Sequence, residues 1–232
     1  MAISNLKPNE RYAIVGKTRS GKTAFAMVIA GTFAQSLPKP WQVWWIDTKG
    51  DEHDLKALRA WGFRNAVSEH DRTNTGGLKN ALYFKITEQD GVEDSVINQV
   101  QHIIDDAYKR HNTLIVVDEY AHVTPSRVNA GRALLNAFQR GGGLNVGIIG
   151  LTQEPVYVPR QLLSQATHIV LFSLTFQADI DYVKKIYRDY VPPLELGYPH
   201  GFYWKWVDGS GPWDFYTDQA TWYANLNVAL KK

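Results

Sequence analysis

Residues 16–23 read Gly16-Lys17-Thr18-Arg19-Ser20-Gly21-Lys22-Thr23 and follow the pattern Gly-x-x-x-x-Gly-Lys-Ser/Thr. The apolar run 11–15 before them predicts a buried strand, and residues 24–35 have the apolar spacing of a helix. A glycine loop between a strand and a helix N-terminus presents backbone N–H groups that can surround a triphosphate. All eight residues are therefore expected to bind a nucleotide. The alternative is a glycine turn without a ligand.

Two residues of this loop carry side chains with defined phosphate chemistry. The Lys22 ammonium is expected to reach the β- and γ-phosphates, and the Thr23 hydroxyl is expected to bind Mg²⁺. ATP and Mg²⁺ are therefore the expected ligands.

A second stretch supplies acids. Residues 114–119 read Leu-Ile-Val-Val-Asp-Glu, an apolar run of the kind seen in buried parallel strands, followed by two carboxylates. Asp118 is expected to hold Mg²⁺ through water, opposite Thr23. Glu119 is expected to polarise an attacking water, which is a requirement of an enzyme that hydrolyses nucleotides. The alternative is a pair of acids that caps the following helix.

A third strand is predicted over residues 145–152, and Gln153 follows it. An amide at that strand end would lie beside the γ-phosphate and position the attacking water. The alternative is a surface glutamine that opens a loop. Arg140, before three glycines, would stabilise phosphoryl charge as an arginine finger from a neighbouring subunit, or would simply complement the dipole at a helix C-terminus. The residues alone leave these two interpretations open.

The turn Asp47-Thr48-Lys49-Gly50-Asp51 ends the strand predicted over residues 41–47. Asp47 would either support the metal site or cap the helix that follows, and the capping role is the expected one.

Composition narrows the class of protein. The chain has 232 residues, a net charge of +2 and no cysteine, so it has neither disulfides nor thiolate metal sites. No window approaches the roughly 18 uninterrupted apolar residues of a membrane helix, and the N-terminus lacks a signal-peptide profile. We therefore expect an intracellular protein that is not secreted. The weak net charge does not by itself indicate nucleic-acid binding.

Strand-like runs alternate with helical stretches, which predicts an α/β fold with a mostly parallel sheet flanked by helices. We expect one domain over residues 1–232, with a core at about 10–190 and a hairpin at about 198–220. Further strands are predicted at 82–87, 168–174, 201–207 and 213–217. Helices are predicted at 22–35, 52–60, 92–110, 129–139, 160–165 and 177–187.

The predicted hairpin is rich in aromatic residues. Phe202, Trp204 and Trp206 alternate with Tyr203 and Lys205. This alternation would suit a stacking platform for single-stranded nucleic acid. The favoured interpretation is a packed face that covers the sheet or a subunit interface.

Taken together, the motifs resemble those of the HerA/FtsK superfamily of P-loop ATPases. The resemblance rests on residues 16–23, the 47–51 turn, Val117-Asp118-Glu119, and Arg140 with its glycines and the strand ending in Gln153. It covers about residues 10–175. It implies a RecA-like core with a Walker A loop and a Walker B strand. It also implies roles within one subunit for Lys22, Thr23, Asp118, Glu119 and Gln153.

Larger members of the superfamily carry membrane segments or DNA-reading domains, and we expect neither in this chain. In size, the chain resembles the genome-packaging ATPases of membrane-containing icosahedral viruses. The resemblance then implies a homo-oligomeric ring, usually a hexamer, that threads double-stranded DNA into a procapsid. Capsid or portal-vertex proteins would be partners, and the location would be the host cytoplasm or the virion vertex. Arg140 would act in the neighbouring subunit, with Arg160 as the competing residue for that role.

An ATP-driven DNA translocase that packages a viral genome is the leading hypothesis. Alternatives are a related motor for plasmid or cellular DNA movement or phage export, a nucleotide-gated assembly factor, and a small-molecule kinase. A ring multiplies a few basic residues into a strong local field, although each of them is otherwise an ordinary solvated side chain. The candidate DNA contacts are Arg127, Arg132, Lys184 and Lys185.

Overall fold

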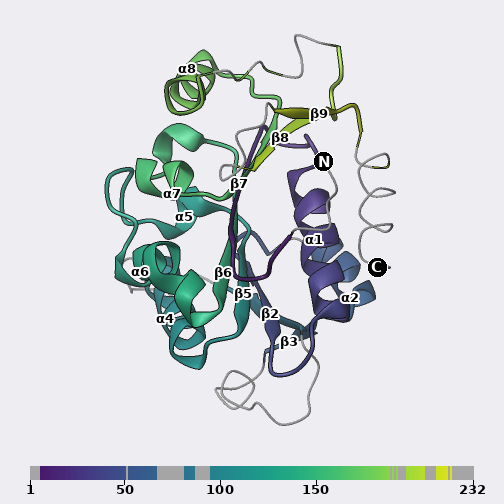
Figure 1. Ribbon diagram of the computed structural model, residues 1–232, viewed down its shortest axis with the longest axis vertical. Helices are drawn as coiled ribbons and strands as arrows, with labels where there is room; N and C mark the ends of the chain where they lie inside the picture. Colours follow the sequence, from purple (N-terminus) through teal and green to yellow (C-terminus); the bar gives the residue numbers. More distant parts are fainter. Residues whose placement is uncertain are drawn as a thin grey trace.

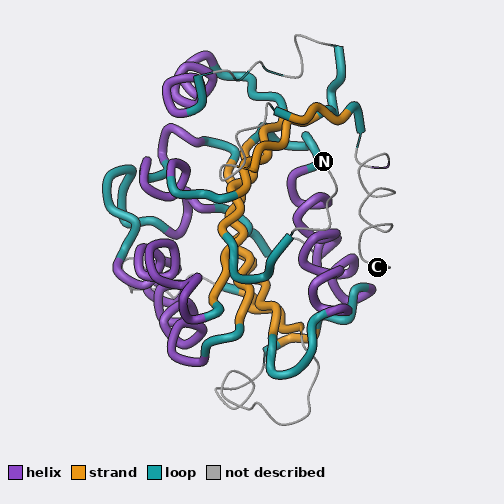
Figure 2. Tube along the Cα trace, viewed as in Figure 1, coloured by secondary structure: helices purple, strands orange, loops and turns teal. Residues whose placement is uncertain are grey.

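A nine-stranded sheet forms the middle layer of the molecule, and helices cover both of its faces (Figures 1 and 2). The computed structural model describes residues 6–50, 52–66, 81–86, 95–188, 190, 192, 197–206, 213–218 and 220. The strands are β1 (Arg11–Val15), β2 (Gln42–Asp47), β3 (Arg64–Asn65), β4 (Ala81–Lys85), β5 (Thr113–Val117), β6 (Val146–Thr152), β7 (His168–Phe172), β8 (Phe202–Trp206) and β9 (Asp214–Tyr216).

Most of the helices follow strands. They are α1 (Lys22–Ser36), α2 (Glu52–Ala60), α4 (Ser95–Arg110), α5 (Tyr120–Val123), α6 (Arg132–Arg140), α7 (Arg160–Ser164) and α8 (Gln177–Ile186), with 3₁₀ turns η2 (Gly141–Leu144) and η3 (Pro155–Tyr157). Among the described residues, no helix combines the length and apolar character needed to cross a membrane.

The strands lie in the order β3-β4-β2-β5-β6-β1-β7-β8-β9. The pairs from β3 to β7 are parallel, and β8 and β9 extend the sheet as an antiparallel hairpin. The predicted α/β fold with a mostly parallel sheet and a C-terminal hairpin is therefore confirmed. Residues 207–212, between the two strands of the expected hairpin, and the first residues of the helix expected at 92–110 lie outside the described residues. The division into domains stays a prediction.

Two apolar layers hold the sheet. Helices α1 and α2 cover one face, whereas α4, α5, α6 and α7 cover the other (Figure 1). Alternate residues of one strand enter different layers: Tyr12 and Ile14 belong to the layer with α1, and Ala13 and Val15 to the layer with α6. Because the central strands are buried on both faces, their sequences are continuous apolar runs rather than alternating ones.

The hairpin is part of the core rather than an open platform. The side chains of Phe202 and Trp204 are buried, and their rings lie 4.9 and 5.8 Å from the ring of Phe25 on α1. On the opposite face, Tyr203 packs against the ring of Trp213. The packed-face interpretation is therefore confirmed for Phe202 and Trp204, although the hairpin extends the sheet rather than covering it.

Gly150, in the middle of β6, makes room for a ring from the next layer. A Cβ atom at this position would fall inside the phenol ring of Tyr120, which is fully buried and packs edge-on against Phe138. Tyr120 is the first residue of α5 and follows Glu119 directly. The packing of β6 against Tyr120 therefore anchors the segment that carries the two acids.

We expect Gly150→Ala to lower the free energy of unfolding by about 1–3 kcal/mol, because the added methyl group must displace a buried ring. Equilibrium unfolding in urea measures this change. Gly143→Ala is the matched control, since no described atom lies within 4 Å of a Cβ built there. Equal stability of the two variants would contradict this account of the packing.

Candidate nucleotide site

The sheet brings the predicted motifs to one edge. Strand β6 pairs with β1 on one side and with β5 on the other, and all three strands run parallel. Their carboxyl ends therefore meet, and ligands of open α/β sheets bind at this edge. The residues that directly follow these three strand ends are Gly16, Asp118 and Gln153.

The glycine loop is held in a shape that ordinary residues rarely adopt. Arg19 has a φ of 59° and Gly21 a φ of 101°, both in the left-handed region. The N–H of Lys17 donates to the carbonyl of Ser173 at 2.8 Å, which fastens the loop to the segment after β7. Helix α1 then begins with no side-chain cap and no acid in its first turn, so its N-terminus favours an anion.

Lys22 lies inside this loop. Its Nζ atom donates to the carbonyl of Lys17 at 2.7 Å, and the residue is 4% exposed. Burial lowers the pKa of Lys22 to about 8, while the nearby charge of Glu119 opposes that shift. The loop thus surrounds an ammonium group that already faces the acids at the end of β5.

Glu119 connects the acids to the neighbouring strand end. Its two carboxylate oxygens accept from the backbone N–H of Gln153 at 3.3 and 3.2 Å, and one of them accepts from the N–H of Ala121 at 3.5 Å. The second contact makes Glu119 the N-cap of α5, so the capping alternative describes part of its role. The Gln153 side chain reaches the glycine loop, where it accepts a hydrogen bond from the hydroxyl of Thr18.

Asp118 and Thr23 have the donor chemistry that Mg²⁺ prefers. Asp118 is 2% exposed, and burial raises its pKa to about 6 although Lys49 lowers it. The described residues hold no cluster of three or more acids or histidines suited to a metal. A magnesium ion bound to a nucleotide needs only one or two protein ligands, because phosphate and water oxygens complete its shell. A hydroxyl and a buried carboxylate therefore fit this group.

Lys49, for which no role was expected, lies beside the two acids at the end of β5. Its Nζ atom lies 3.1 Å from Oδ1 of Asp118 and 3.9 Å from Oε2 of Glu119. The expected role of Asp47 was wrong in detail, since its Oδ1 accepts from the N–H groups of Lys49 and Gly50 in the turn, before α2 begins. The only sequence signal for Lys49 was its place in the Asp-Thr-Lys-Gly-Asp turn.

Arg140 lies at the amino ends of the parallel strands, opposite the edge that carries the glycine loop. It is the exposed last residue of α6, and η2 leads from it to the start of β6. The guanidinium of Arg11, at the start of β1, donates to the carbonyl of Phe138 in the same helix end. A five-residue strand spans about 16 Å, so Arg140 is remote from the glycine loop of its own chain.

The remaining basic candidates are exposed and occupy separate elements. Lys184 and Lys185 lie in the last turn of α8, and Arg132 begins α6. Arg127, in the loop after α5, lies near Arg160 and Tyr182. Burial raises the pKa of Tyr182, and these two guanidinium groups oppose that shift.

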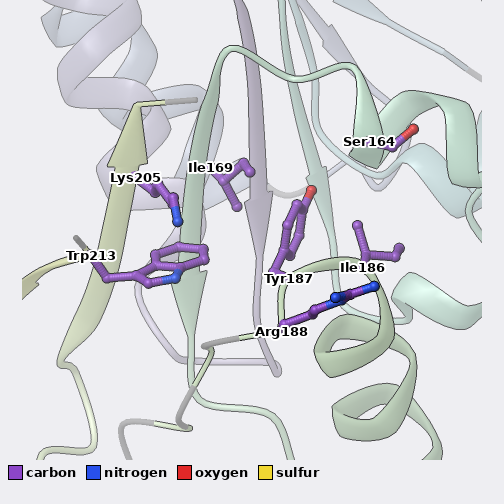
Figure 3. A pocket seen from close by; sticks show the side chains of 7 residues that line it. All are labelled: Ser164, Ile169, Ile186, Tyr187, Arg188, Lys205 and Trp213. Carbon is purple, nitrogen blue, oxygen red and sulfur yellow. The ribbon is translucent and has the colours of Figure 1, made fainter. Parts of the chain in front are cut away.

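A cavity of about 360 Å³ lies away from this edge, between β7, the hairpin and the end of α8 (Figure 3). The lining residues are Ser164, Ile169, Ile186, Tyr187, Arg188, Lys205 and Trp213. None of them belongs to the glycine loop or to the strand ends that carry the acids, so this cavity is separate from the candidate site.

Comparison with solved structures identifies proteins of the same architecture. The genome packaging NTPase B204 from Sulfolobus turreted icosahedral virus 2, in complex with AMP, is 16% identical, covers 92% of this chain and 99% of its own, and has a TM-score of 0.66. Its complex with ATP-gammaS gives 15% identity, the same coverage and a TM-score of 0.67. VirB4 of Thermoanaerobacter pseudethanolicus gives 12% identity, 77% and 81% coverage, and a TM-score of 0.53.

No protein-family model and no curated protein sequence matches the chain. At identities this low, the structural likeness establishes a shared fold. The likeness expected from the sequence motifs is confirmed at that level: this chain shares its fold with the genome packaging NTPase B204 and with VirB4.

Proposed function

We propose that the protein hydrolyses ATP at the edge where β1, β5 and β6 end. The observation that carries this proposal is the connection from Thr18 through Gln153 to Glu119. It joins the phosphate-binding loop to a buried carboxylate that can accept a proton from water. Hydrolysis requires such a base, whereas nucleotide binding alone does not.

In the proposed mechanism, the N–H groups of the loop and the Lys22 ammonium bind the phosphates. Thr23 and Asp118 hold Mg²⁺, which supplies charge neutralisation on the phosphate oxygens when bound. Glu119 accepts the proton of the water that attacks the γ-phosphorus, the bond to the β,γ-bridging oxygen breaks, and ADP and phosphate leave. The Gln153 amide orients the attacking water. The loop N–H groups and Lys22 also stabilise the charge that spreads over the transferred phosphoryl group.

We further propose that hydrolysis drives double-stranded DNA movement, with viral genome packaging as the task. The fold shared with the packaging NTPase B204 supports this assignment. We also propose a homo-oligomeric ring, in which Arg140, remote from the glycine loop of its own chain, would reach the phosphates of another subunit. Capsid or portal-vertex proteins would be the partners of such a ring, at the virion vertex or in the host cytoplasm.

Two substitutions separate nucleotide binding from turnover. Lys22→Ala should abolish hydrolysis by removing the phosphate contact. Glu119→Gln should retain binding of an ATP analogue while kcat falls by about 10²–10⁴ through loss of the base. Calorimetric titration and steady-state phosphate release measure the two effects. Lys56→Ala, on the exposed face of α2, is the control, and a Glu119→Gln protein with the kcat of the unmodified protein would rule out Glu119 as the base.

Stimulation by DNA tests the translocase. Long double-stranded DNA should raise the hydrolysis rate, and this stimulation should weaken with salt, because phosphate contacts release counterions. The measurement is ATP turnover with and without DNA at low and moderate salt. Hydrolysis that is indifferent to DNA at both salt concentrations would support the nucleotide-gated assembly factor instead.

Mixed assemblies test the arginine finger. If Arg140 acts in the neighbouring subunit, Arg140→Ala subunits mixed with unmodified ones should lower activity by more than their share of the mixture. Activity is measured across a series of mixing ratios, and Arg160→Ala is tested in parallel. A strictly proportional loss for Arg140→Ala would place its effect within one subunit.

A further inference from the structure

Lys49 extends toward the acids from a turn that the Asp47 carboxylate holds by hydrogen bonds. Oδ1 of Asp47 accepts from the N–H groups of Lys49 and Gly50, both at 2.8 Å. Oδ2 of the same carboxylate accepts from the hydroxyl of Tyr83 on β4. Because Asp47 is held by three donors from two elements, the turn presents the Lys49 side chain in one direction, toward the end of β5.

Lys49 contacts the carboxylates of Asp118 and Glu119, which are buried and carry like charges. The Asp118 and Glu119 side chains are 3% and 4% exposed, whereas that of Lys49 is 26% exposed. Within the described part of the chain, Lys49 is the only cation within 4.0 Å of either carboxylate. It also donates to the backbone carbonyl of Asp118 at 3.4 Å. Adjacent buried carboxylates repel each other, and such charges persist in a fold only when they are paired.

We propose that Lys49 is a positioning residue that holds the carboxylates of Asp118 and Glu119 at the end of β5 in the arrangement that hydrolysis requires. This inference rests on the proposed ATPase function and adds a residue to it. Lys22 has a different task, because its ammonium is bonded within the glycine loop. Tyr83 and Asp47 act indirectly, because they hold the turn from which Lys49 extends.

The test compares Lys49→Met with Lys49→Arg, and Lys56→Met is the control for removing an exposed lysine. We expect Lys49→Met to lower kcat by about 10–100-fold, the usual cost of losing a residue that orients ligands. The Kd for ATP-gammaS should change by less than about twofold, since binding belongs to the loop. Lys49→Arg keeps the charge and should recover part of kcat. A weakened Kd with an unchanged kcat would instead make Lys49 a phosphate-binding residue and overturn the proposal.

Tyr83→Phe tests the route by which Lys49 is positioned. It should lower kcat less than Lys49→Met does, and the double variant should be no slower than Lys49→Met alone. Such non-additivity is the signature of two residues that act through one arrangement. Fully additive losses would contradict the proposed dependence of Lys49 on the turn.

A measurement without nucleotide keeps this inference separate from the ATPase proposal. Lys49→Met should lower the Tm by about 5 °C or more, because it removes the cation within 4.0 Å of two buried carboxylates. Adding Asp118→Asn should restore part of that loss. A Tm unchanged by Lys49→Met would overturn the pairing itself. If the unmodified protein hydrolysed no ATP, the ATPase proposal would fail, and this unfolding cycle would still decide whether Lys49 holds the acids.

Discussion

Two carboxylates lie side by side and almost fully buried at the end of β5, and much of the surrounding structure compensates for their charge. Lys49 approaches from the β2 turn, the N–H of Gln153 approaches from the end of β6, and Lys22 lies in the glycine loop. Each compensating group comes from a different segment of the sheet edge. Because these acids are buried, the turn after β2, the residues after β6 and the glycine loop depend on one another for their local structure.

The topology explains why only part of this arrangement was visible in the sequence. Continuous apolar runs and a glycine loop are local signals, and the strands and long helices formed where those signals placed them. The two-residue strand β3 and the short helix α5 carry no such pattern. The roles of Lys49, Tyr83 and Gly150 depend on contacts with residues far away in the sequence. The local spacing of residues does not determine which strands are neighbours in the sheet.

The same topology constrains the two arginines considered as fingers. A helix that leads into a parallel strand ends at the amino edge of the sheet, whereas the nucleotide edge lies at the carboxyl ends. Arg140 ends such a helix and therefore lies at the amino edge. Arg160 follows β6 and begins α7, so it does not lie there. Sequence spacing alone could not separate them, because both are close to Gln153 in the chain.

The sheet has many strands, but its two outermost described strands are short. In the described part of the chain it ends in β3, with two residues, on one side and in β9, with three residues, on the other. A long free border would present a row of unpaired backbone groups that any extended segment could join, regardless of its sequence. Among the described residues, the two outermost strands offer only short runs of backbone for a strand-to-strand contact between copies of the chain. In the described part of the chain, the surface open to an ordered assembly is instead made of side chains on helices and connecting loops, where the choice of partner depends on sequence.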